Sequence, residues 1–194
     1  MRTVNGLFDD YDNASDAVGE LEASGVPSDD ISIVANNSEE WYRDDDRSAA
    51  AEDAGAGAGI GAVVGGAGGL LTGLGVMAIP GVGPVVAAGW LAATAVGAAA
   101  GAAVGGVAGG IIGALTDSGV SERDAHVYAE GIRRGGALVT ARVSDELAPM
   151  AERILGQSTA VDLDSRRRDY EAEGWTAFDP DAPAYRSGKG RRVP

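Results

Sequence analysis

Both ends of the chain alternate between apolar runs of strand length and amphipathic stretches of helix length. Apolar residues that recur every two positions predict strands, and those that recur every three or four positions predict helices. The predicted strands span residues 2–8, 31–35, 137–143 and 159–163, and the predicted helices lie between residues 12 and 25, 121 and 135, and 144 and 155. Without the centre of the chain, this order is β-α-β, an extra helix, and β-α-β. We therefore expect an α+β domain of the ferredoxin-like class, with its helices on one face of an antiparallel sheet.

The centre of the chain, residues 54–116, holds 63 consecutive residues without a charged side chain. Prolines and glycines at residues 79–84 interrupt this segment and divide it into two arms. Within each arm glycines recur every four residues, at Gly57, Gly61, Gly65, Gly69 and Gly73 in the first arm and at Gly97, Gly101, Gly105, Gly109 and Gly113 in the second. Because small residues at this spacing let two helices approach closely, we predict an all-α glycine-zipper helical hairpin inserted into the α+β domain.

Each predicted arm is long enough to cross a bilayer. A helix of about 25 residues spans about 37 Å, whereas the hydrocarbon core of a bilayer is about 30 Å thick. Neither arm has a polar face, so its helix must be buried in lipid or in protein. Trp90, an aromatic residue near the start of the second arm, would suit a membrane interface. The low hydrophobicity of glycine and alanine keeps a second interpretation open, in which the hairpins form the buried core of a soluble homo-oligomer or filament.

These patterns divide the chain into four segments. Residues 1–53 hold the first half of the α+β domain and an acidic linker, and residues 54–116 hold the hairpin. Residues 117–165 complete the α+β domain, and residues 166–194 are expected to form an extended tail. The tail would dock onto the domain through three aromatic residues, Trp175, Phe178 and Tyr185.

The composition excludes several classes of chemistry. The chain has no cysteine and one histidine, which excludes a disulfide scaffold, a thiol nucleophile and a multi-histidine metal site. Its net charge of −14 argues against nucleic acid as a partner, because binding DNA requires the phosphates to be neutralised. His126 has Glu122 and Glu130 four residues away on either side, but no nucleophile or metal ligand accompanies it. We therefore assign no catalytic, cofactor-binding or metal-binding residue, and we predict that the protein is not an enzyme.

Acidic residues cluster directly after the first predicted strand. Asp9, Asp10, Asp12 and Asp16 lack the glycine and the glutamate that an EF-hand calcium loop requires at its sixth and twelfth positions. Carboxylates at the start of a helix accept hydrogen bonds from its first N–H groups and interact favourably with its dipole. We therefore expect these residues to cap the helix that follows.

Four stretches of the two ends of the chain resemble a known family. They are TVNGLFDDY at residues 3–11, GVPSDDIS at 25–32, GVSERDAHVY at 119–128 and RGGALV at 134–139. These stretches resemble the heat-induced (YflT-type) general stress protein domain, and members with a glycine-zipper insertion between the two halves match the layout of this chain. The resemblance implies a stress-associated bacterial protein, and it supplies no catalytic or ligand-binding residue.

From these observations we predict a non-enzymatic, stress-associated membrane protein that self-associates through its glycine-zipper hairpins and displays the small α+β domain. Its partners would be further copies of itself and the lipid bilayer. Because the chain begins without a basic and then apolar leader, we expect it in the bacterial inner membrane with both soluble flanks in the cytoplasm. The alternatives are a soluble cytoplasmic homo-oligomer and a small-ligand sensor that uses the sheet of the α+β domain.

Overall fold

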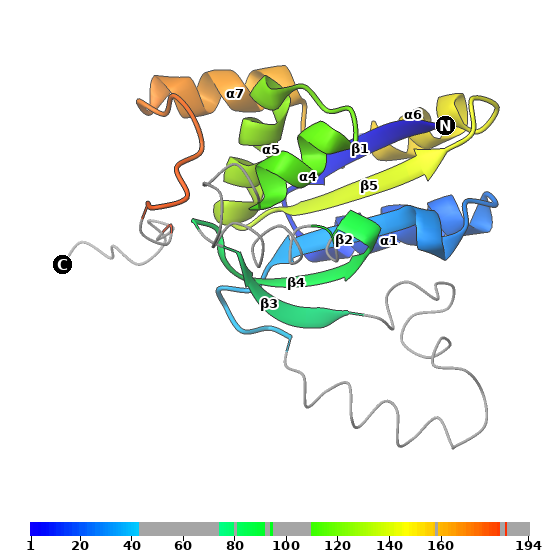
Figure 1. The fold of residues 1–194 in the computed structure, drawn as a ribbon, viewed down its shortest axis with the longest axis horizontal. Helices are drawn as coiled ribbons and strands as arrows, with labels where there is room; N and C mark the ends of the chain where they lie inside the picture. The colour runs from blue at the N-terminus through cyan, green and yellow to red at the C-terminus, as the bar shows by residue number, and fades with distance from the viewer. Residues whose placement is uncertain are drawn as a thin grey trace.

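The structure is a computed structural model, and it describes residues 1–42, 74–79, 81–91, 94, 110–157, 159–182 and 185. Its strands are β1 (Arg2–Phe8), β2 (Ile31–Asn36), β3 (Gly75–Ile79), β4 (Gly83–Gly89) and β5 (Ala137–Val143). Its helices are α1 (Tyr11–Ala23), α4 (Gly110–Asp117), α5 (Glu122–Arg133), α6 (Ala148–Leu155) and α7 (Leu163–Ala172), with a 3-10 turn at Ser28–Asp30. The strands form one sheet in the order β1-β5-β2-β4-β3, and all neighbouring strands are antiparallel (Figure 1). The predicted mixed α+β class is therefore confirmed.

Helices cover both faces of this sheet, whereas the sequence predicted helices on one face. Side chains alternate between the two faces of a strand, so Phe8 and Leu7 enter two separate apolar cores. The first core lies between the sheet and the helices α1 and α6, and it includes Ile33 and Val139. The second lies between the sheet and the helices α4 and α5, and it includes Val34 and Leu138. The extra helix of the predicted order therefore has a structural role, because α5 covers the face that a ferredoxin-like sheet was expected to leave open.

The predicted strand at residues 159–163 is reduced to one antiparallel bridge, between Phe8 and Ala160. The Asp162 side chain accepts a hydrogen bond from the Ser165 N–H, and this cap starts α7 at Leu163. Part of the expected extended tail is thus a helix. Since the fourth expected strand is only a bridge and two further strands extend the sheet beyond β2, the ferredoxin-like topology is not confirmed.

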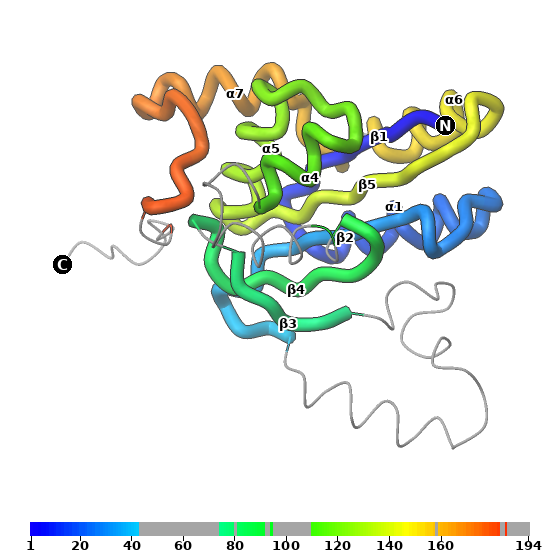
Figure 2. Tube along the Cα trace, in the orientation of Figure 1, coloured from blue at the N-terminus to red at the C-terminus, as the bar shows by residue number. Residues whose placement is uncertain are grey.

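The largest correction concerns the two predicted helical arms. Residues 75–79 and 83–89 form the hairpin of β3 and β4, which follows β2 at the edge of the sheet (Figure 2). Residues 79–84 do contain a turn, as predicted, but it joins two strands, with Met77 opposite Val85. Val85 and Val86 favour the strand, because they are fully buried on opposite faces of the sheet. An α-helical hairpin that turns at this point is therefore ruled out.

Nine of the ten glycines of the predicted zipper lie outside the described residues. This is true of Gly57, Gly61, Gly65, Gly69, Gly73, Gly97, Gly101, Gly105 and Gly109. Gly113 lies on α4, a helix of eight residues that packs through Ile111, Ala114 and Leu115. Among the described residues no helix has the length and apolar character needed to cross a bilayer. Together with the β3–β4 hairpin, this finding overturns the prediction of a membrane protein. Trp90, which was expected at a membrane interface, directly follows β4, and its ring centroid lies 4.6 Å from the Arg142 guanidinium.

The segment after α7 docks against the second core. Phe178 is buried there, and its backbone N–H donates a hydrogen bond to Nδ1 of His126 at 3.2 Å. The Arg167 guanidinium pairs with the carboxylates of Asp124 and Asp164, which ties α7 to the start of α5. These contacts fix α7 and the segment after it beside the first turns of α5.

Replacing Gly89 by alanine tests the assignment of residues 83–89 to a strand. A Cβ atom at Gly89 would lie 2.2 Å from the Ile31 carbonyl oxygen, and the backbone there has a φ of +88°. We expect Gly89→Ala to lower the free energy of unfolding by about 2–3 kcal/mol in a denaturant titration.

The matched control is Gly25→Ala, where φ is +93° but a Cβ atom would meet nothing within 4 Å. This variant should lose only about 1 kcal/mol. In a helix, alanine would be more stable than glycine by about 0.5–1 kcal/mol, so a stabilised Gly89→Ala variant would contradict the strand.

Candidate functional site

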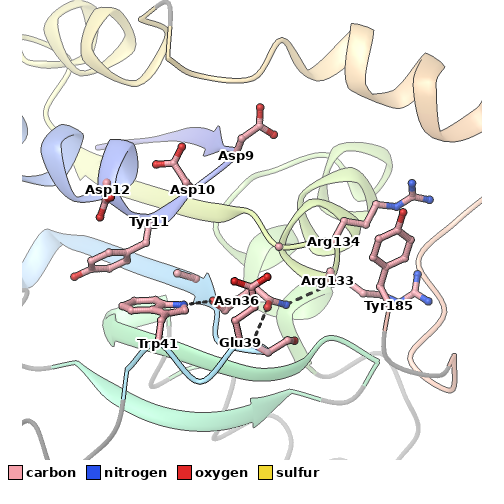
Figure 3. A pocket seen from close by; sticks show the side chains of 13 residues that line it. Asp9, Asp10, Tyr11, Asp12, Asn36, Glu39, Trp41, Arg133, Arg134 and Tyr185 are labelled. Carbon is pink, nitrogen blue, oxygen red and sulfur yellow. Dashed lines mark hydrogen bonds between the residues drawn. The ribbon is translucent and has the colours of Figure 1, made fainter. Parts of the chain in front are cut away.

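A cleft of about 550 Å³ opens at the end of the sheet where β1 and β2 both finish (Figure 3). Both strands are antiparallel to β5, so they are parallel to each other and their carboxyl ends lie at the same edge. Three segments line the cleft: residues 9–12 after β1, residues 35–41 at and after the end of β2, and residues 133–135 at and after the end of α5. Tyr185 completes the lining.

The segment after β1 is shaped by a helix cap. The Asp10 carboxylate accepts hydrogen bonds from the backbone N–H of Asn13 at 2.9 Å and from its side-chain amide at 2.7 Å. The cap starts α1 at Tyr11 and places Asp12 in the first turn, at the mouth of the cleft. The expected capping role is thus confirmed for Asp10, whereas Asp9 pairs with the Arg166 guanidinium at 2.7 Å.

Asn36 organises the segment after β2. This residue is 9% exposed, and its side-chain amide nitrogen donates to the Ile132 carbonyl at 3.0 Å while its amide oxygen accepts a hydrogen bond from the Ser38 N–H at 2.8 Å. The Asn36 carbonyl in turn accepts a hydrogen bond from Nε1 of Trp41 at 2.8 Å. The side chain and the backbone carbonyl of this one residue therefore connect the end of β2, the end of α5 and the Trp41 ring.

Two aromatic rings form one wall of the cleft. The centroids of Tyr11 and Trp41 lie 4.5 Å apart, and the Trp41 side chain is 41% exposed. Burial raises the pKa of the Tyr11 hydroxyl; the Ser15 hydrogen bond opposes this shift, and Tyr42 and Asp12 add to it. Tyr11 is therefore an uncharged phenol at neutral pH, and the wall presents aromatic surface to solvent.

The opposite wall holds two arginines whose charges are already compensated. Glu130 is 1% exposed, and its carboxylate accepts hydrogen bonds from Nη1 of Arg133 at 2.9 Å and from Nε of Arg134 at 2.6 Å. Arg134 also pairs with Glu173, and its guanidinium lies 4.1 Å from the Tyr170 ring centroid and 4.9 Å from that of Tyr185. Burial lowers the pKa of Arg134, but the hydrogen bonds to the two glutamates outweigh it and raise the pKa overall. Both guanidinium groups flank Tyr185, at the far end of the cleft from Trp41 (Figure 3).

The open part of the cleft is consequently acidic. Asp9 has Arg166 as its partner, and Asp10 caps α1. The ion pairs among the described residues include neither Asp12 nor Glu39, and both side chains are exposed at the cleft. Negative charge therefore surrounds the Tyr11–Trp41 wall.

The site differs from the one that the sequence predicted. Neither the described zipper glycine, Gly113, nor Trp90 lines this cleft. His126 does not line it either, and Nδ1 of its ring accepts a hydrogen bond from the Phe178 N–H. In the part of the chain that the structure describes, no group of three acidic or histidine side chains is arranged to hold a metal ion. Sequence reasoning missed Tyr11, Asn36 and Trp41, although one signal was present: two adjacent aromatic residues, Trp41 and Tyr42, within a polar and acidic linker.

Comparison with known proteins gives one match. Residues 3–79 match the family model of the heat induced stress protein YflT domain, which supports a general stress protein family. The matched range covers β1, α1, β2 and β3, and with them the cleft residues from Asp9 to Trp41. Neither the curated proteins nor the solved structures give a significant match.

Replacing Glu130 by glutamine tests the compensation of the two arginines. Glutamine has nearly the same shape but no charge, so Arg133 and Arg134 would lose their common anionic partner in a largely buried position. We expect Glu130→Gln to lower the free energy of unfolding by about 3 kcal/mol, measured by denaturant titration. Glu122→Gln, at an exposed position on the same helix, should change it by no more than about 0.5 kcal/mol. Equal effects of the two changes would show that the buried carboxylate is not the anchor of the arginine pair.

Proposed function

We propose that this chain is a non-enzymatic, stress-associated binding domain whose cleft holds a small ligand. The observation that carries the proposal is the cleft of about 550 Å³, a volume within the range of small-molecule sites. Its lining combines an aromatic pair, the half-buried Tyr11 and the exposed Trp41, with polar groups from three separate segments. Sites of this kind bind ligands by contact with the rings and orient them through the polar groups.

The stress association is supported by the match to the YflT domain, since nine of the thirteen lining residues fall within residues 3–79. The non-enzymatic character is supported by the lining itself. Ser38 is the hydroxyl-bearing side chain of the segment after β2, and the described residues that line the cleft include no histidine to activate it.

The spatial order of the strands supports a ferredoxin-like origin for the part of the sheet formed by β1, β5 and β2. The bridge at Ala160 lies on β1, on the side away from β5, so the order reads residue 160, β1, β5, β2. We propose that β3 and β4 were added to this unit at the β2 edge. The cleft would then belong to the original unit, because its two strand ends are those of β1 and β2.

A ligand screen by nuclear magnetic resonance tests this proposal. The chain would be screened against a mixed library of cationic, neutral and anionic small molecules, with the Trp41 indole N–H and the Asn36 amide as reporters. We expect compounds that shift both signals to bind at least about tenfold more weakly to Ser38→Phe, because the phenyl ring occupies the cleft. The compounds should also be recovered unchanged after incubation.

Ser24→Phe is the matched control. Ser24 is exposed at the opposite end of α1, far from the cleft, so this variant should bind like the unaltered chain. Three results would contradict the proposal: no compound that shifts the cleft signals, equal weakening in both variants, or conversion of a bound compound.

A further inference from the structure

We infer that the ligand of this cleft is an organic cation, a protonated or quaternary amine, held against the Tyr11–Trp41 pair and beside the carboxylates of Asp12 and Glu39. This inference rests on the proposed function, and it adds the chemical class of the ligand. It follows from the geometry of the aromatic wall, from the distribution of charge and from the size of the cleft.

The indole of the aromatic wall offers its ring face and no free donor. The Trp41 Nε1 group already donates to the Asn36 carbonyl at 2.8 Å, so the indole cannot also donate to a ligand. The Tyr11 ring lies 4.5 Å away at a tilt of 38° and is half-buried, whereas Trp41 is exposed, so the accessible π surface is mainly that of the indole. The face of an aromatic ring attracts cations, and tryptophan does so most strongly.

The charges around this surface favour the same class of ligand. Figure 3 shows Asp10 and Asp12 on the Tyr11 side of the cleft and Glu39 beside Trp41. Asp12 and Glu39 take part in none of the ion pairs formed by the described residues, whereas the arginines of the opposite wall are held by Glu130 and Glu173. The glutamates already compensate the positive charge of these guanidinium groups, so an anion gains little attraction there, while a cation finds carboxylates already available.

The size of the cleft distinguishes an organic cation from a metal ion. A volume of about 550 Å³ is far larger than a metal ion needs. The carboxylates also do not converge, since no group of three potential metal ligands occurs among the described side chains. An amine with several carbon atoms uses both the ring faces and the dispersed carboxylates.

Three probes of the same shape and different charge test the inference. They are choline, its uncharged analogue 3,3-dimethylbutan-1-ol, and the anion 3,3-dimethylbutanoate, each titrated into the full chain while the Trp41 indole and Asn36 amide signals are followed. We expect choline to bind at least about tenfold more tightly than the uncharged analogue, and the anion to leave these signals unchanged. Equal binding of choline and the uncharged analogue, or tighter binding of the anion, would overturn the inference.

Single substitutions locate the effect within the cleft. Trp41→Leu should weaken choline binding about tenfold, with the Asn36 amide as the reporter, and Asp12→Asn and Glu39→Gln should each weaken it about three- to fivefold. Asp145→Asn is the matched control, because Asp145 follows β5 at the opposite end of the sheet and is equally exposed. If Asp145→Asn weakens binding as much as Asp12→Asn, the attraction comes from the acidic chain as a whole and the assigned site is wrong.

The outcomes separate this inference from the proposed function. If neutral or anionic compounds bind the cleft and lose affinity in Ser38→Phe, the cleft is a ligand site and only its assignment to cations fails. If no compound of any charge shifts the cleft signals, the proposed function and the inference fail together.

Discussion

The pairing of β5 with both β1 and β2 is the constraint on which the rest of the structure depends. β5 forms seven residue pairs with β1 and five with β2, although at least 100 residues separate it from either strand. Because β5 lies between them, β1 and β2 are parallel to each other and about 10 Å apart, which is two strand spacings of about 4.8 Å each. The ends of β1 and β2, the start of α1 and the end of α5 then meet at one edge of the sheet, and the space between them is the cleft. Long-range pairing of this kind costs loop-closure entropy, which the buried side chains of β2 and β5 must offset.

The close approach of α5 to the sheet places the charged groups of the cleft. A Cβ atom at Gly131 would lie 2.6 Å from a methyl carbon of Leu7, so a side chain larger than hydrogen would require the Leu7 side chain or α5 to shift. At this distance Glu130 is almost fully buried, and a buried carboxylate is costly unless it is paired and hydrogen-bonded. Arg133 and Arg134 provide that pairing from the last turn of the same helix and the residue that caps it. The presence of Arg133 and Arg134 at the cleft therefore follows from the burial of α5, because the buried Glu130 carboxylate needs them as partners.

The sequence predicted the local elements where one signal dominated. Strands 2–8 and 137–143 have the expected bounds, strand 31–35 is longer by one residue, and Ser121 caps α5 at the start of the helix predicted between residues 121 and 135. The prediction failed at β4, where Val85 to Ala88 are all buried, because a strand covered on both faces shows no alternation and resembles a buried helix. The four-residue glycine period then favoured a helix. The cleft could not be predicted from local signals either, since Tyr11 and Trp41 become neighbours only when β5 separates β1 from β2.

The charge of the cleft depends on the segment after α7 as much as on the cleft residues themselves. Glu173 and the rings of Tyr170 and Tyr185 enclose the Arg134 guanidinium, and the Phe178 contact with His126 holds this segment in place. Without these groups, Arg134 would keep only Glu130, a carboxylate it shares with Arg133, and the two arginines would carry an excess of positive charge at the cleft. The docked segment thus cancels the positive end of the cleft and leaves the acidic end beside Trp41 dominant. The preference of the site for one sign of charge is therefore a property of the whole fold, because it requires the end of the described chain to lie against α5.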